Sequence, residues 1–166
     1  PTANPTFIGS LLWVPPSGRD SVKLYVLAGS GRFDQGRNFN NPQLLDLVWT
    51  HKLDDRTTYT LDAIVTRQDN VPGMGTIHAW GVVHYLTHAL TPRLSAVARA
   101  ETFNDADGQR TGYQGLYLAG TAALVYKPHP WLMLRPEVRY DYNTESRPFQ
   151  GRRGVLTAAL DMVFRF

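Results

Sequence analysis

The chain has 166 residues, of which 43% are hydrophobic, 11% aromatic and 19% charged, and its net charge is +3. This small, scattered basic excess includes no basic cluster with interleaved aromatic residues, which argues against a nucleic-acid partner. Cysteine is absent, which excludes disulfides and thiolate metal sites, and no segment approaches the roughly 18 uncharged apolar residues of a membrane-spanning helix.

Apolar and polar residues alternate along segments bounded by turn residues, a pattern that predicts β-strands with two unlike faces. The segments run to about ten residues or more, whereas ~5–6 is usual in globular proteins and ~9–11 is needed to cross a bilayer as a tilted strand. In chain order the nine predicted strands span about residues 6–15, 21–30, 42–51, 57–68, 77–89, 94–104, 114–127, 131–143 and 153–166.

The predicted connections alternate between short and long. Four are tight, "PPSGRD", "KLDDR", "LTPR" and "KPHP", and between them lie "GRFDQGRNFNN", "DNVPGMGT", "NDADGQRTG" and "NTESRPFQGRR". Outer-membrane barrels combine short periplasmic turns with longer outer loops. The sequence therefore predicts an all-β fold, an antiparallel transmembrane β-barrel.

Nine is an odd number of strands, whereas a bacterial single-chain barrel normally has an even number with both ends in the periplasm. We therefore expect residues 1–166 to be the C-terminal portion of one larger, even-stranded barrel domain, with at least one strand and a signal peptide preceding them. The opening "PTANPTF" has no basic region, apolar region or initiator Met. The alternatives are a miscounted strand, or a segment 6–15 that plugs or lines the pore.

Charged side chains share one face of the segment "WLMLRPEVRYDYN". Placed toward lipid, each would cost about 2–4 kcal/mol near the midplane, so we expect them to face a water-filled lumen. Pro136, within the same segment, predicts a local bulge. The other reading is the solvated face of a soluble sheet. The predicted pore-lining residues are Asp46, Asp62, Arg99, Glu101, Arg135, Glu137, Arg139, Asp141, Asp161 and Arg165.

No catalytic or metal-binding constellation emerges. His84 and His88 lack the glutamate of a zincin motif and would lie about 13 Å apart on a strand. The acidic stretch "DADG" fails the EF-hand spacing, and strand alternation explains Glu137 and Asp141 without catalysis. The sequence predicts neither an enzyme nor a protein with a metal or cofactor.

Three runs carry a family resemblance: "GVVHYLTHALTPRLSAVARAETFNDADGQRTG", "LYLAGTAALVYKPHPWLMLRPEVRYDYN" and "PFQGRRGVLTAALDMVFRF". They resemble the C-terminal half of the putative beta-barrel porin-2 family of bacterial outer membranes. The resemblance covers roughly residues 57–166 and is weaker over 1–56, and family members look considerably longer than this chain. It implies an outer-membrane pore, with no solute and no catalytic residues to carry over.

The final strand alternates apolar residues up to a terminal aromatic, with Phe164 and Phe166 on its apolar phase. This ending resembles the signal read by the barrel assembly machinery of the outer membrane. The further partners expected are outer-membrane lipid and lipopolysaccharide, small polar solutes, and a homo-oligomer or larger envelope complex.

Together these features predict a porin of the Gram-negative outer membrane, which lets small hydrophilic solutes or ions diffuse through a charge-lined lumen with modest ion preference. Two other classes stay open. One is a structural or scaffold barrel whose outer loops bind a partner protein or surface polymer, and the other is a soluble ligand-binding barrel of the lipocalin type.

Overall fold

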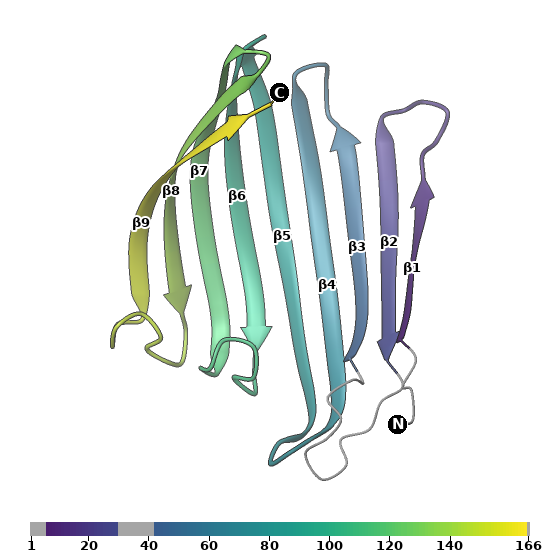
Figure 1. Ribbon diagram of the computed structural model, residues 1–166, viewed down its shortest axis with the longest axis vertical. Helices are drawn as coiled ribbons and strands as arrows, with labels where there is room; N and C mark the ends of the chain where they lie inside the picture. The colour runs from purple at the N-terminus through teal and green to yellow at the C-terminus, as the bar shows by residue number, and fades with distance from the viewer. Residues whose placement is uncertain (1–5, 30–41, 166) are drawn as a thin grey trace.

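A computed structural model describes residues 6–29 and 42–165 of the chain. These residues form one antiparallel sheet in which each strand pairs with its neighbours in the sequence (Figure 1). No helix in these two ranges is long and apolar enough to cross a membrane. The strands are β1 (Thr6–Trp13), β2 (Asp20–Gly29), β3 (Pro42–Lys52), β4 (Thr57–Val71), β5 (Gly75–Thr91), β6 (Leu94–Asp105), β7 (Gly115–His129), β8 (Leu132–Asn143) and β9 (Gly154–Phe164).

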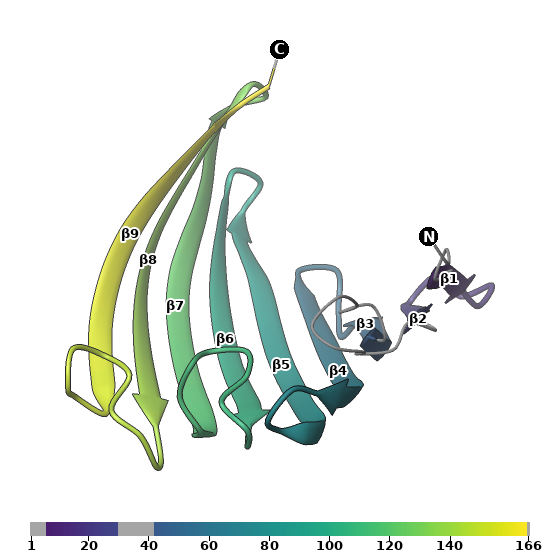
Figure 2. The ribbon, with the colours of Figure 1, turned by 60° about the horizontal axis from the view of Figure 1, so that its bottom comes forward.

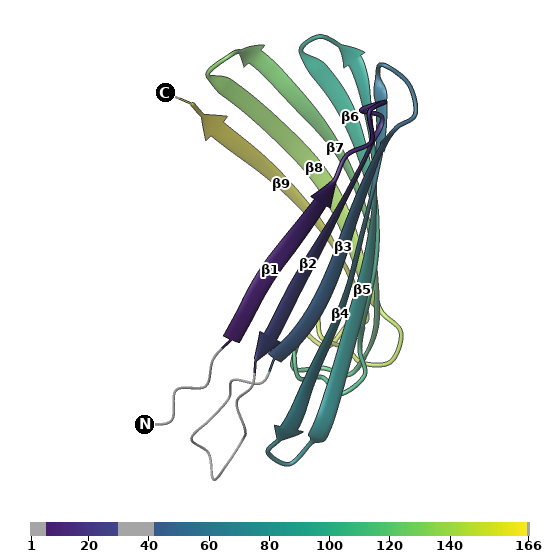
Figure 3. The same ribbon diagram turned by 90° about the vertical axis from the view of Figure 1, so that its right-hand side faces the viewer.

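The sheet is long, twisted and curved, so that its two faces are unlike in shape (Figures 2 and 3). It is not closed: β1 and β9 form its two edges and run in the same direction. The predicted fold class is confirmed as an all-β antiparallel sheet, consistent with a portion of a barrel wall. The end of the sheet that carries the connections after β1, β3, β5 and β7 is called the turn end below, and the opposite end the loop end.

Strands β4 and β5 extend further than the sequence predicts. "DNVPGMGT" was expected to be a long loop, but β4 and β5 continue through most of it and leave only residues 72–74 between them. Met74 N donates to Val71 O at 3.0 Å, and Gly73 has φ +76°. A Pro–Gly pair at the centre of a turn with positive φ at the glycine favours a tight type II turn. The strict alternation of short and long connections is therefore wrong at this hairpin.

The bulge expected at Pro136 is also absent. Pro136 pairs in register with Leu160 of β9, while no pair with β7 forms at this position, although the β7–β8 register is the same on both sides of it. Proline has no N–H to donate, so it interrupts one ladder without inserting an extra residue. The irregularity between β7 and β8 lies instead between Tyr126 and His129, near the turn end.

Two buried polar residues fasten the connections of the loop end. Asp105 is 1% exposed, and its Oδ2 accepts hydrogen bonds from the amides of Arg110 at 3.0 Å and Thr111 at 2.8 Å. Asn143 is fully buried, and its Oδ1 accepts from the amides of Glu145 and Ser146. Buried side-chain acceptors that satisfy loop amides hold the loops in one conformation. The "DADG" stretch is therefore a structural turn, with Asp105 facing its own backbone.

At the turn end the β3–β4 connection is organised by one exposed carboxylate. Asp54 Oδ1 accepts hydrogen bonds from the amides of Arg56 and Thr57, both at 2.7 Å. These hydrogen bonds lower the pKa of Asp54 below its usual value, the bond from the Arg56 amide contributing most and those from Thr57 next. The reason is that hydrogen bonds donated to a carboxylate stabilise its charged form.

We expect Asp54→Ala to lower the free energy of unfolding at neutral pH. A carboxyl whose pKa is depressed on folding contributes stability above its unfolded pKa of about 3.9 and loses that contribution as the pH falls through the folded value. The difference from wild type should therefore vanish in acid. Urea unfolding in detergent micelles at neutral and acidic pH measures this, with Asp55→Ala in the same turn as control; a pH-independent difference would contradict the capping role.

Candidate pore lining

The strand register sorts the side chains onto two faces, because residues paired directly across neighbouring strands point to the same side. One continuous row runs Arg99, Thr121, Arg139 and Thr157 across β6 to β9. Following the pairs from strand to strand puts nine predicted pore-lining residues on this same face, called the charged face below: Asp46, Asp62, Arg99, Glu101, Arg135, Glu137, Arg139, Asp141 and Asp161. Arg165 follows β9 at the turn end, where its amide donates to Trp131 O.

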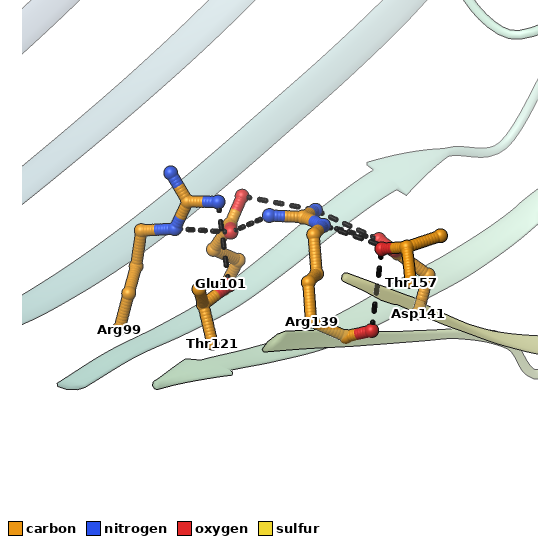
Figure 4. Close-up of polar contacts among 6 residues, drawn as sticks. All are labelled: Arg99, Glu101, Thr121, Arg139, Asp141 and Thr157. Atoms are coloured by element: carbon orange, nitrogen blue, oxygen red, sulfur yellow. Dashed lines mark hydrogen bonds and ion pairs between the residues drawn. The ribbon is translucent and has the colours of Figure 1, made fainter. Parts of the chain in front are cut away.

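The centre of the charged face is a chain of ion pairs (Figure 4). Arg99 Nε lies 2.7 Å from Glu101 Oε1, Arg139 pairs with the same Glu101, and Arg139 Nη2 lies 2.7 Å from Asp141 Oδ1. Arg99 also donates to Thr121 Oγ1 at 3.3 Å. The alternating signs thus neutralise one another over three strands.

Small side chains on β7 make this chain possible. Glu101 lies on β6 and Arg139 on β8, so their side chains meet across the strand between them. The charged-face positions of β7 opposite them are Ala119 and Thr121. Because strands lie about 4.8 Å apart, an arginine can reach over such short side chains to a carboxylate two strands away.

The remaining charges are distributed unevenly. Arg135 pairs with Asp161, and both side chains are about half exposed at 45% and 48%. Glu137 lies between Arg135 and Arg139 on β8, yet each arginine is paired with another carboxylate, and Glu137 has no ion pair among the described residues. Glu137 is therefore the uncompensated charge of this half of the sheet.

The other half of the charged face holds an acidic pair. Asp46 and Asp62 lie diagonally across β3 and β4, close enough to interact with each other. Lys23 of β2 is on the same face, but its ammonium stands 4.5 Å from the centre of the Tyr25 ring. No ion pair connects Lys23 to either carboxylate within the described part of the chain. The β3–β4 wall is therefore electronegative.

The opposite face, called the apolar face below, has large aliphatic side chains with no covering layer in the described residues. Leu156 and Leu160 are 68% and 63% exposed. In the described part of the chain the only buried hydrophobic residues are Ile77 and Ala79, and the register puts both on the charged face. A sheet of a soluble domain must bury its apolar face against a second layer, and soluble monomers rarely expose contiguous apolar surface of this extent. Lipid is the environment that this surface fits.

Aromatic side chains gather at both ends of the apolar face. At the turn end Trp131 stacks on Phe164 with ring centres 6.2 Å apart, and Trp49 meets Tyr59 edge to face. Near the loop end the register places Trp80 and Tyr140 on this face. Aromatic girdles at both lipid–water boundaries are typical of membrane barrels. Phe164 lies on the apolar face, the phase that its position in the final strand predicts, whereas Phe166 lies outside the described residues.

The histidines that resembled metal ligands each have another partner. His84 Nδ1 is 2.7 Å from Tyr59 Oη, and His88 Nδ1 is 2.9 Å from Thr57 Oγ1. Both histidines lie on the apolar face near the turn end. Among the described residues there is no group of three or more His, Cys, Asp or Glu that could hold a metal ion.

Sequence reasoning missed how the loops meet the charged face. Phe149, in the connection between β8 and β9, packs edge to face on Tyr117 with ring centres 6.5 Å apart, and Tyr117 also meets Phe103. Tyr117 and Phe103 are paired on the charged face. The connection therefore bends toward that face. Asn143 before a polar segment could have indicated an anchored turn, but no signal in the sequence pairs Phe149 with Tyr117.

The structure is a long antiparallel sheet with two unlike faces: one is apolar with aromatic residues at both ends, and the other has paired charges. These are the features of the wall of a porin-like β-barrel. The chain belongs to the family described as Putative beta-barrel porin-2, OmpL-like, which matches residues 1–166, the whole chain rather than the 57–166 of the predicted resemblance. No curated protein and no solved structure matches the chain in the corresponding comparisons.

Arg139→Gln should destabilise the fold more than Arg135→Gln. Removing Arg139 leaves Asp141 without its cation, and leaves Glu101 with Arg99 alone, in a site where the side chains are only about a quarter exposed, which should cost about 2–3 kcal/mol. The Arg135–Asp161 pair is half exposed and should be worth less than about 1 kcal/mol. Urea unfolding of the folded protein in micelles measures both, and equal losses would contradict the chain of ion pairs.

Proposed function

We propose that this chain forms part of an outer-membrane porin, which lets small hydrophilic solutes and ions diffuse passively through a lumen lined by the charged face. The observation that carries the proposal is the segregation of the faces: nine predicted charges share one side, and most of the exposed aliphatic residues and the girdle residues share the other. Charged side chains at membrane depth are tolerated where they face water and are costly toward lipid.

Closure of the wall is part of the proposal. The edge strands β1 and β9 run in the same direction, so an antiparallel closure needs an odd number of further strands between them. In lipid an unpaired strand edge leaves backbone donors and acceptors unsatisfied, which only a closed barrel avoids. We expect these strands to come from the same polypeptide outside residues 1–166, with the turn end in the periplasm and the loop end outside, as is usual for such barrels.

The charges predict the sign of the ion preference. Among the residues that the structure describes, the charged face away from its two rims has six carboxylates and four cations: Asp46, Asp62, Glu101, Glu137, Asp141 and Asp161, and Lys23, Arg99, Arg135 and Arg139. All three arginines are neutralised by ion pairs, whereas Glu137 is not. A lumen with surplus fixed carboxylates attracts cations. The pore should therefore favour cations modestly.

Single-channel recording of the purified full-length protein in a planar bilayer tests the pore directly. Stable current steps proportional to salt concentration are the expected result. Silence from protein shown to be inserted and folded would contradict the porin proposal and favour a plugged or structural barrel, for which the inward-bent Phe149 connection would be the first segment to examine.

Reversing Arg135 and Arg139 to glutamate should increase the preference for cations, measured as the reversal potential across a salt gradient. Each reversal removes a cation from the lumen and releases carboxylates that it had neutralised. Arg67→Glu is the matched control, because the register puts Arg67 on the apolar face. Unchanged selectivity in both lumen variants, with conductance retained, would contradict the lumen assignment.

A further inference from the structure

Part of the charged face is covered at the loop end, although the lining of a pore should meet water. Gln68, Ile77 and Ala79 are 8%, 4% and 7% exposed, and the register puts all three on the charged face. They belong to the β4–β5 hairpin, which projects beyond the neighbouring strands at this end (Figure 1). Because neighbouring strands lie beside a side chain and not above it, a segment outside the sheet must cover these residues.

The β6–β7 connection, residues 106–114, supplies this cover. The three buried residues line a small hollow whose other side is formed by Gln109 and Arg110 of the connection. Asp107 Oδ2 accepts a hydrogen bond from the amide of His78 at 3.3 Å, which fixes the connection to β5 beyond the point where the β5–β6 pairing begins. The connection therefore lies across the loop-end mouth of the charged face.

The β8–β9 connection, residues 144–153, joins the same layer. Ser146 Oγ donates to Gln114 O at 2.6 Å, which ties one connection to the other. Phe149 packs on Tyr117, a residue of the charged face whose hydroxyl group bonds the β6–β7 connection. The two connections together are called the mouth layer below, and both are held on the side of the charged face.

The exposed charges of the mouth layer are mostly positive. Its arginines are exposed and form no ion pair within the described residues: Arg110, Arg147, Arg152 and Arg153. Of its two carboxylates, Asp107 is bonded by the His78 amide and Glu145 is exposed. The β3–β4 wall has the opposite sign, because Asp46 and Asp62 have no ion pair in the part of the chain that the structure describes.

The basic mouth layer and the acidic wall are far enough apart to act separately. Gln68, which lines the hollow with Arg110, lies six residues beyond Asp62 on the same face of β4. At ~3.3 Å per residue this separation is about 20 Å, whereas the Debye length is about 10 Å at 0.1 M salt. Near physiological ionic strength the two regions therefore follow one another along the pore without cancelling.

We propose that the mouth layer makes the pore a current rectifier, with Arg110 as a residue that determines the selectivity of the mouth. The inference rests on the proposed porin function and refines its cation preference, which then belongs to the wall and not to the mouth. Fixed charges of one sign enrich the ions of the opposite sign. When the loop-end side is negative, anions enter through the basic mouth and cations enter past the acidic wall. Both then accumulate in the pore and raise its conductance, whereas the opposite voltage depletes both.

Current–voltage recording of single channels of the full-length protein in a planar bilayer tests this inference. With about 0.1 M KCl on both sides, the currents at equal voltages of opposite sign should differ about twofold. At about 1 M KCl the Debye length falls to about 3 Å and the difference should vanish. The ratio of the larger to the smaller current is the readout, because it does not depend on the orientation of insertion.

Three variants separate the charge of the mouth from other causes. Arg110→Glu should bring the current ratio close to one, because it replaces the cation of the mouth by a carboxylate. Arg110→Lys keeps the charge and should rectify as wild type. Arg67→Glu is the matched control, because Arg67 is an exposed arginine near the loop end that lies on the apolar face, and it should also rectify as wild type.

Symmetric currents through the wild-type channel at about 0.1 M KCl would overturn the inference, and so would an equal current ratio in Arg110→Glu and wild type. A loss of rectification in Arg67→Glu or Arg110→Lys as large as in Arg110→Glu would also contradict it, since the charge at the mouth would not be the cause. A conducting but symmetric channel contradicts only this inference. Silence from inserted, folded protein contradicts the porin proposal on which the inference rests.

Discussion

The constraint on which this structure depends is the hydrogen bonding of the backbone in a medium without water. A strand that crosses lipid must pair every N–H and C=O with a neighbouring strand. In the described residues each strand is bonded to its neighbours in the sequence, which is the simplest connectivity. This explains strands of up to 17 residues, much longer than a soluble sheet requires. Among the described strands, β1 and β9 each leave one edge without a neighbour.

Once the strands are hydrogen-bonded in this order, solvation explains why the two faces of the sheet differ in composition. Alternation sends successive side chains to opposite sides, so the register gathers most of the charged residues on one face and most of the large exposed aliphatic residues on the other. Within the charged face, desolvation is limited by pairing: Arg139 joins Glu101 and Asp141, and short β7 side chains leave the space for it to do so. The charges outside this pairing, such as Glu137, then set the electrostatic field at the charged face.

Much of this could be predicted from the sequence, for a physical reason. Period 2 is a local property, so the nine strands and the common face of Arg135, Glu137, Arg139 and Asp141 follow from the order of residues in one segment. The pairing partners are not local. That Arg139 meets Glu101, 38 positions earlier, depends on the registers of β6, β7 and β8 together, which the hydrophobic pattern leaves undetermined.

The two wrong predictions, at the β4–β5 connection and at Pro136, also have local causes. The segment around Pro72 and Gly73 looked like a long loop because it is rich in turn residues, whereas a tight turn with Pro72 and Gly73 at its centre lets the strands continue on both sides. The bulge at Pro136 was expected because proline lacks a donor, but the loss of the β7 pairs at Pro136 and Arg135 is tolerated without a shift of register. Turn residues indicate where a chain bends and say little about how far the neighbouring strands extend.

The central claim, that the charged face meets water and the apolar face meets lipid, is tested most directly by single-cysteine labelling, since the chain has no cysteine of its own. Ala123 and Ala122 are neighbours on β7: Ala123 pairs with Glu137 on the charged face, and Ala122 with Val138 on the apolar face. In the folded, bilayer-inserted protein, a membrane-impermeant thiol reagent should label Ala123→Cys rapidly and leave Ala122→Cys unlabelled. Labelling of both at equal rates, or of Ala122→Cys alone, would contradict the account.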